Sequence, residues 1–179
     1  MEQKKMSLAI SVAGIILLSS LTYAEAKSES RTLWVHVNVE PVFLVEVTPH
    51  TRGNTIEFGA VQHLFGQVTQ TEPVQVDISV ISNLGVPYQV SQSMSGLLSN
   101  EEGVPLPQES FLVEASQASL GIGKITNLKS VSPEGEILFE SNAKGNSDQF
   151  TASYLLKIPP TQAGGNYQTN LVYTIATKE

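Results

Sequence analysis

Short apolar runs with a period of two residues fill most of this chain, and they constrain its fold more than any other feature. The clearest interior run places four β-branched residues on one face, with polar residues between them: Val74, Val76, Ile78 and Val80. Because successive side chains of a strand point to opposite faces, this run predicts a strand with one buried face. Clusters of Gly, Pro, Asn and Ser separate the runs, and no segment predicts a helix. The sequence therefore predicts an all-β, immunoglobulin-like antiparallel sandwich, with a closed barrel as the alternative.

Further runs predict the neighbouring strands in the first half of the chain. Residues 42–47 predict a strand that follows a break at Pro41, and Ile56 with Phe58 predicts a short one. After turn residues at 82–85 the alternation resumes, so residues 74–93 predict two neighbouring strands. The Gly- and Pro-containing stretch at 96–108 predicts a surface loop.

The second half is less regular until its end. Single pairs of apolar residues predict short strands at 111–113 and 137–139, and a loop is expected at 141–148. Residues 150–158 and 167–175 then alternate clearly, so we expect them to form a terminal strand pair. The connection between them contains Gly164 and Gly165, which permit backbone conformations with positive φ.

The first 26 residues have the features of an export signal. Lys4 and Lys5 precede an apolar core at 6–21, and Ala24-Glu25-Ala26 offers a small-x-small cleavage site. The apolar core is short and contains serines, which disfavours a membrane anchor. We therefore expect a signal peptide at 1–26 and an exported chain with one domain, located outside the cytoplasm.

The composition limits the classes of partner. Cysteine is absent, so the exported chain has no disulfides and must gain stability from its core or from another chain. Ten Lys and Arg residues against 17 Asp and Glu residues give a formal net charge of −7 without basic clusters. A nucleic-acid partner is excluded on this ground, because phosphate contacts need concentrated Lys and Arg.

The beginning of the exported chain carries a second clear alternation. Its apolar face consists of Leu33, Val35, Val37 and Val39, and it ends at Glu40-Pro41. His36 and Asn38 face the other way, as does Trp34. The run can be the first strand of its own domain, as half-buried strands often look like this, or a strand that is donated to a neighbouring chain.

Catalysis has little support in the sequence. The three histidines, His36, His50 and His63, have no metal-ligand spacing, and the chain lacks a cysteine nucleophile, a nucleophile elbow and a phosphate-binding glycine loop. The adjacent carboxylates Glu101 and Glu102 can be interpreted as a calcium or acid–base pair, but solvated loop charges are the simpler interpretation. We expect no enzyme, no metal site and no cofactor.

Both ends of the chain resemble the cysteine-free major subunits of colonisation-factor fimbriae, which are the alpha-type pilins of chaperone–usher assembly. The order of a short alternating strand, the Glu40-Pro41 pair and a second apolar strand at 42–47 is similar to the start of such pilins. Residues 163–167, Ala-Gly-Gly-Asn-Tyr, resemble the Ala-Gly-x-Tyr that introduces their last strand, with one residue more. The terminal Lys178-Glu179 departs from the family pattern.

The resemblance implies a fold and a function. It implies an incomplete sandwich at 42–179 whose groove is completed by the donor strand of the next subunit, here within residues 27–41. Leu33, Val35, Val37 and Val39 are then the groove-filling residues, Pro41 marks the end of the donated strand, and the acceptor groove includes Leu171, Tyr173 and Ile175.

The partners implied by the resemblance are other fimbrial subunits, a periplasmic chaperone, an outer-membrane usher and a host-surface receptor. The chain would then reach the cell surface as part of a fimbrium that supports adhesion. The alternative is a self-complete secreted sandwich that binds carbohydrate or a cell surface, although the aromatic residues Trp34, Phe65 and Tyr88 do not form a recognisable sugar platform in the sequence.

Overall fold

The structure is a computed structural model that describes residues 31–62 and 66–178. The chain divides into two compact units, residues 1–38 and residues 39–179. In the first unit, the described residues 31–38 form neither strand nor helix. The predicted signal peptide lies outside the described residues.

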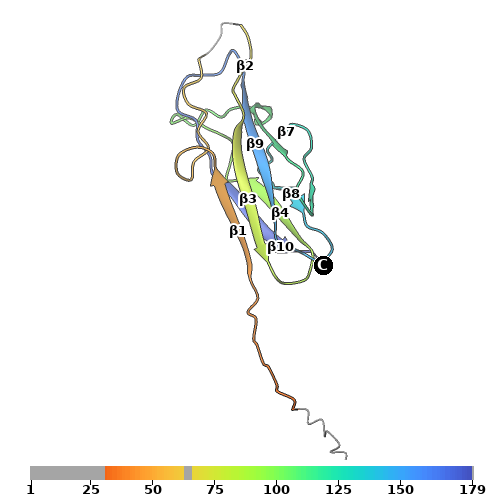
Figure 1. Cartoon of the computed structure of the whole chain (residues 1–179). Coiled ribbons are helices and arrows are strands. Elements are labelled where there is room, and N and C mark those ends of the chain that lie inside the picture. Colours follow the sequence, from red (N-terminus) through yellow and green to blue (C-terminus); the bar gives the residue numbers. More distant parts are fainter. Residues whose placement is uncertain (1–30, 63–65, 179) are drawn as a thin grey trace, which may run out of the picture. The chain divides into compact units, whose positions relative to one another are not determined.

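The second unit is an all-β sandwich of two antiparallel sheets (Figure 1). Its strands are β1 (Phe43–Pro49), β2 (Thr69–Gln70), β3 (Val74–Ser82), β4 (Tyr88–Met94), β5 (Phe111–Ala115), β6 (Ile122–Gly123), β7 (Lys129–Ser130), β8 (Glu136–Glu140), β9 (Asp148–Ile158) and β10 (Leu171–Thr177). One short 3₁₀ helix, Gln108–Ser110, precedes β5. The predicted fold class, an all-β sandwich, is confirmed.

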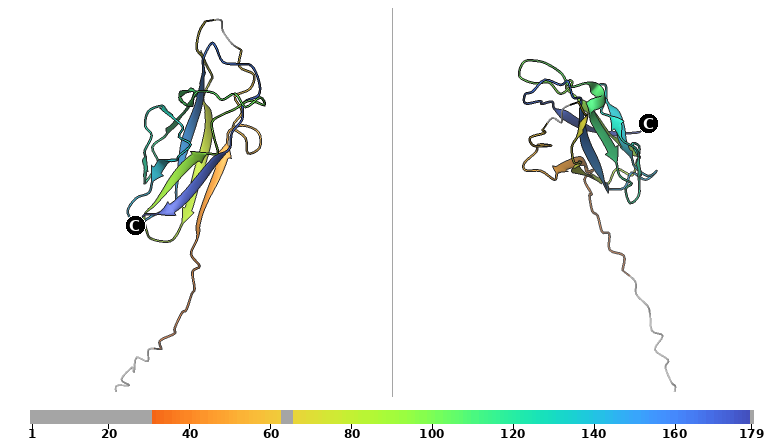
Figure 2. Two further views of the ribbon diagram at one scale, coloured as in Figure 1. Left: turned by 180° about the vertical axis from the view of Figure 1, so that it is seen from behind. Right: turned by 90° about the horizontal axis from the view of Figure 1, so that it is seen from above.

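The two sheets have different strand orders. The first sheet has the order β1-β3-β9-β5-β7, with β2 paired to β9, and the second has the order β10-β4-β8-β6. Two further views show the sheets as facing layers (Figure 2). β1 and β10 are therefore edge strands, one in each sheet, and in Figures 1 and 2 they lie side by side.

The core lies between the inward faces of the central strands. Val76, Ile78 and Val80 of β3 are buried, as the alternation predicts, and so are the inward residues of β9. Aromatic rings fill much of the space, with Phe139 stacked on Phe150 at a centroid distance of 4.8 Å. Such tightly packed aromatic pairs add to the free energy gained from burying apolar area.

Two predicted strand pairings are wrong. Residues 74–93 do form two strands, but β3 and β4 belong to opposite sheets, and so do β9 and β10. The connection at 83–87 crosses from one sheet to the other, and Pro87 ends beside β10, where its carbonyl accepts the Lys178 N–H at 2.8 Å. A period of two identifies the buried face of a strand but not the neighbour with which the strand pairs.

The predicted short strand at Ile56 and Phe58 is also wrong, because this segment has no strand assignment. The Phe58 ring instead packs edge-on against Phe111, with centroids 6.2 Å apart. The loop at 96–108 and the start of β9 at Asp148 agree with the prediction in outline.

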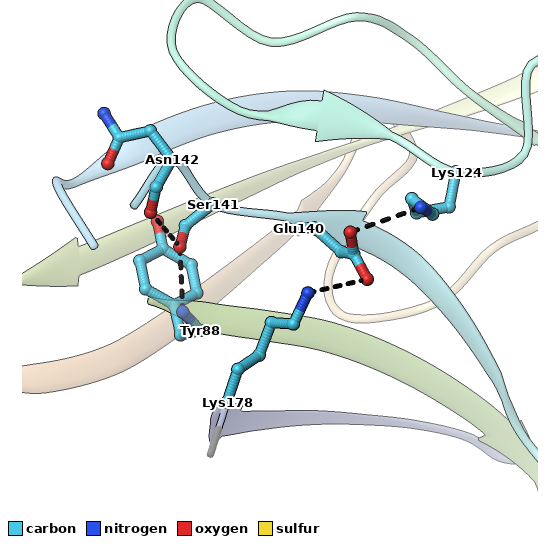
Figure 3. A network of polar contacts seen from close by, with 6 residues as sticks. All are labelled: Tyr88, Lys124, Glu140, Ser141, Asn142 and Lys178. Atoms are coloured by element: carbon cyan, nitrogen blue, oxygen red, sulfur yellow. Dashed lines mark hydrogen bonds and ion pairs between the residues drawn. The ribbon is translucent and has the colours of Figure 1, made fainter. Parts of the chain in front are cut away.

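A polar cluster holds the C-terminal end of β10 against β8 (Figure 3). Lys178 Nζ lies 3.1 Å from Glu140 Oε1, and Lys124 Nζ lies 3.2 Å from Glu140 Oε2. The hydrogen bonds from Lys178 and Lys124 lower the pKa of Glu140. Nearby, the Tyr88 N–H donates to Ser141 Oγ at 2.8 Å. Lys178, which departs from the family pattern, thus has a structural partner in this chain.

Candidate binding groove

A groove opens at the end of the sandwich where the edge strand β1 ends and the edge strand β10 begins. Its volume is about 1300 Å³. The apolar residues that line it come from both sheets and from the loops beyond them: Val47, Ile56, Phe58, Leu97, Leu98, Leu106, Phe111, Leu156, Leu171 and Tyr173. The groove therefore gives access to the hydrophobic core at this end of the sandwich, on the side of the two edge strands.

Incomplete burial marks the same side of the sandwich. The inward residues of the edge strands are only half-buried, although they pack on the core: Phe43, Val45, Val47, Leu171, Tyr173 and Ile175. The equivalent residues of β3 and β9, such as Ile78 and Tyr154, are 0% exposed. A strand placed between β1 and β10 would cover this half-buried apolar stripe.

The backbone of β10 leaves one row of hydrogen-bonding groups directed away from β4. The Ser95 N–H donates to Asn170 O at 3.0 Å, and the Lys178 N–H donates to Pro87 O at 2.8 Å. Alternate residues of an antiparallel strand bond to opposite neighbours, so the even-numbered residues of β10 face β4. The odd-numbered residues face the outer edge, where no strand of residues 31–62 or 66–178 pairs with them.

A buried polar chain lies beneath the groove. The hydroxyl groups of Tyr173 and Tyr154 are 2.7 Å apart, and Tyr154 Oη also donates to Gln92 Oε1. Gln92 Nε2 in turn donates to Glu136 Oε1 at 3.0 Å. Burial raises the pKa of Tyr173 to about 12 and raises that of Tyr154 well above its ordinary value. Both phenols are therefore neutral at physiological pH. The hydrogen bond between their hydroxyl groups fixes the inward orientation of the Tyr173 side chain.

The side chain of Asn83 fixes the start of the sandwich unit. Asn83 Oδ1 accepts the Val42 N–H at 2.6 Å, and Asn83 Nδ2 donates to Glu40 O at 2.8 Å. These two bonds hold the chain on either side of Pro41 at the end of the sandwich where β1 begins. Phe43 lies at this end too, with its ring 5.8 Å from that of Tyr88.

The residues predicted to form a donor strand have no strand assignment in the structure. The exposed fractions of their apolar side chains are high: Leu33 87%, Val35 91%, Val37 75% and Val39 72%. Trp34, the single tryptophan of the chain, is 95% exposed. The predicted acceptor residues Leu171, Tyr173 and Ile175 occupy consecutive inward positions of β10.

His50, which the sequence analysis singled out, contacts a carboxylate of β3. His50 Nε2 lies 2.8 Å from Asp77 Oδ2, whose other oxygen accepts the Thr151 hydroxyl at 2.8 Å. The hydrogen bond from His50 is the main cause that lowers the pKa of Asp77. Within the described ranges, no three His, Cys, Asp or Glu residues are placed to hold a metal ion.

The remaining candidates are scattered. Glu101 and Glu102 are exposed, and Tyr88 is fully buried. His36 is exposed, whereas His63 and Phe65 lie outside the described residues. No helix among the described residues is long and apolar enough to cross a membrane.

The sequence analysis did not predict the loop residues that line the groove or the buried polar chain that contains Gln92. Phe58 and Leu106 are brought to the groove by loop packing that leaves no periodic pattern, whereas Phe111 belongs to β5. Gln92 is 1% exposed although it is polar. Its position, two residues after Val90 and four after Tyr88 on the same face of β4, was the available signal.

No protein-family model matches the sequence, and no curated protein matches it significantly. Among solved structures, a family 123 glycoside hydrolase from Clostridium perfringens aligns with 75% of this chain at 15% identity and a TM-score of 0.41. The aligned part is 25% of that chain, so this protein spans about a quarter of the hydrolase's length. A similarity this low transfers neither a family nor an activity.

Proposed function

We propose that this chain is a structural subunit of a cell-surface fimbria and that it polymerises by donating residues 33–39 to the groove of another copy. The proposal rests on two features of the same chain that complement each other, an incompletely covered apolar surface and an exposed apolar segment. The sandwich has a half-buried apolar stripe beneath two edge strands, and the same chain has an exposed, alternating segment with four apolar residues.

Strand addition supplies the binding energy for this assembly. Main-chain hydrogen bonds along β10 give affinity, and alternate side chains that enter the groove give register. A fully buried Val or Leu is worth roughly 1.5 to 3 kcal/mol, so four of them contribute roughly 6 to 12 kcal/mol before ordering costs. This is sufficient for a stable contact between subunits without any disulfide.

The geometry of such a contact leads to a linear fibre. The donated segment and the groove are different surfaces of the same subunit, so the interface is heterologous. A heterologous interface that does not close on itself generates an open filament. One type of subunit can therefore build the shaft.

The proposed partners and location follow from the open groove. An open apolar groove with a free strand edge promotes aggregation, so the subunit needs a periplasmic chaperone to cover the groove before assembly. An outer-membrane usher then joins the subunits, and the fimbrium supports adhesion at the cell surface. The exported chain begins at Lys27 in this proposal.

Sedimentation velocity of the chain from Lys27 to Glu179 tests the proposal. We expect a series of oligomers whose masses are successive multiples of the subunit, because each added copy exposes a new groove. The matched control lacks residues 31–41 and should sediment as a single monomer. A monodisperse monomer for the undeleted chain at high concentration would contradict polymerisation and favour a self-complete sandwich that binds carbohydrate or a cell surface.

A further inference from the structure

We infer that assembly creates a second contact between copies, outside the groove. An exposed apolar patch at the start of β1 packs against the sandwich of the copy that holds the donated segment. This outer patch consists of Val42, Leu44 and Ile81. The inference rests on the proposed function and adds to it a second surface, whose partner is another copy of this chain.

The outer patch is formed by two neighbouring strands. Leu44 of β1 pairs directly with Ile81 of β3, and directly opposite residues of an antiparallel pair have their side chains on the same face. The exposed fractions of the three side chains are 36% for Val42, 38% for Leu44 and 43% for Ile81. Phe43 and Val45, which alternate with them, pack on the core. The outer patch therefore lies on the outward face of the first sheet.

Apolar side chains are concentrated at this end of that face. The other outward residues of β1 and β3 are polar: Glu46, Thr48, Gln75, Asp77 and Ser79. Single exposed apolar residues are normal on a protein surface, but a cross-strand pair beside a third apolar residue is a small patch. Its position is the end of the sandwich where the chain enters β1.

A short spacer brings the outer patch close to the partner. Only Glu40 and Pro41 separate the donor segment from Val42. An extended chain spans at most about 3.6 Å per residue, so Val42 lies within about 11 Å of Val39. When Val39 is bound in the groove of another copy, the outer patch is therefore held next to the sandwich of that copy.

Asn83 fixes the spacer to its own sandwich. Its Oδ1 atom accepts the Val42 N–H at 2.6 Å, and its Nδ2 atom donates to Glu40 O at 2.8 Å. The ring of Pro41 restricts φ between these two bonds. The spacer thus has little freedom to turn the outer patch away from the partner, and a fixed spacer lowers the entropy lost when the contact forms.

The outer patch contributes only together with the donated segment. Three partly exposed side chains form a surface far smaller than the interface of a stable complex, so the patch alone does not hold two copies together. Once the segment is bound, the second contact becomes intramolecular and benefits from a high effective concentration. The proposed contact therefore strengthens and orients an assembly that the groove initiates.

A double substitution in the outer patch tests the contact. The variant combines Leu44→Thr with Ile81→Thr in the chain from Lys27 to Glu179, because threonine suits an exposed strand position and removes apolar surface. Sedimentation velocity over a concentration series gives the concentration at which half of the chain is assembled. We expect this concentration to rise at least tenfold in the variant.

The matched control removes two apolar side chains that are more exposed than those of the outer patch. It combines Leu120→Thr with Ile122→Thr, at positions that are 52% and 58% exposed. Ile122 belongs to β6, at the edge of the second sheet away from β10. We expect the same concentration at half assembly as for the unchanged chain.

A peptide titration checks that the groove is intact in the outer-patch variant. The peptide has the sequence of residues 31–41 and lacks the outer patch. The acceptor is the full exported chain with Val37→Asp, whose own segment cannot fill a groove, either alone or combined with Leu44→Thr and Ile81→Thr. Calorimetry should give dissociation constants that agree within about twofold, because the peptide contacts only the groove.

A longer spacer tests whether the two contacts are linked through the chain. Insertion of Gly-Ser-Gly-Ser between Val39 and Glu40 keeps the Asn83 bonds but frees the donor's sandwich from its partner. In this chain the outer patch is no longer held beside the partner. We therefore expect Leu44→Thr with Ile81→Thr to change the concentration at half assembly by less than about twofold.

Each outcome separates the second contact from the proposed function. Equal assembly of the unchanged chain and the outer-patch variant overturns the second contact and leaves polymerisation intact. An equal loss in the control variant, weaker peptide binding by the outer-patch variant, or an undiminished loss with the longer spacer overturns it as well. The absence of oligomers from the unchanged chain refutes the proposed function itself.

Discussion

Replacing Val37 with Asp is expected to stop oligomer formation while the subunit itself still folds. Val37 belongs to the exposed donor segment and is not one of the buried core residues of its own sandwich. In the groove it would be buried among apolar side chains, where a carboxylate loses its hydration without gaining a cationic partner. A loss of about 3 kcal/mol corresponds to an affinity reduced at least about 100-fold. Sedimentation velocity should therefore show monomer alone.

The matched control for this variant is Asn38→Asp, which adds the same charge at the neighbouring residue. Asn38 faces outward in the proposed contact, so its variant should form the same oligomer series as the unchanged chain. Equal loss of oligomers in both variants would show that charge in the segment, and not burial of Val37, governs assembly. Loss of the folded monomer in the Val37→Asp variant would show that the segment is part of its own domain.

A peptide with the sequence of residues 31–41 is expected to bind the Val37→Asp chain with one-to-one stoichiometry. That variant keeps an intact groove and carries a donor segment that cannot fill the groove of another copy. A dissociation constant of about 10 µM or tighter is expected, which corresponds to about −7 kcal/mol. Isothermal titration calorimetry measures both the stoichiometry and the affinity.

Peptide binding should also stabilise the fold, because the peptide binds the folded groove and not the unfolded chain. At a peptide concentration 100 times the dissociation constant, the gain is about 2.7 kcal/mol and the melting temperature rises accordingly. The control peptide carries Val37→Asp and should have no effect at the same concentration. Binding of both peptides with similar affinity would contradict recognition of the apolar face.

The inward faces of the long strands could be predicted from the sequence for a simple physical reason. In β3 and β9 every second residue is apolar over four or more alternate positions, and such a pattern predicts a strand with one face on a core. The two-residue strands β2, β6 and β7 are too short to leave a pattern. Their pairing with neighbouring strands depends on tertiary packing and not on a local sequence pattern.

Strand order could not be predicted from the same pattern. β3 and β4 follow each other closely, yet Pro87 borders β10 and the chain crosses to the second sheet. Whether a short connection forms a hairpin or crosses between sheets depends on how the two layers pack. The period of two residues is the same in both cases.

The groove could be predicted only in part. Leu171, Tyr173 and Ile175 were candidates because they share one face of the last strand, and the structure places them on the inward face of an edge strand. The contribution of Phe58 and Leu106 depends on the packing of loops, which no local pattern encodes. Their role is visible only after the two sheets are in place.

The central claim is that residues 33–39 complete a sandwich other than the one to which they are attached. Thermal melting of three chains tests it most directly: the chain from Lys27 to Glu179, the chain without residues 31–41, and that deleted chain with residues 31–41 fused after Glu179. A flexible linker joins Glu179 to the fused segment, so that the segment can reach the groove of its own sandwich.

We predict that the fusion is monomeric and melts about 10 °C or more above the deleted chain, since about 3 kcal/mol of added stability shifts a domain of this size by that amount. The undeleted chain should form oligomers in the same buffer. The opposite result is a stable monomer for the undeleted chain together with no gain in the fusion. The segment would then belong to its own domain, and the fimbrial account would be wrong.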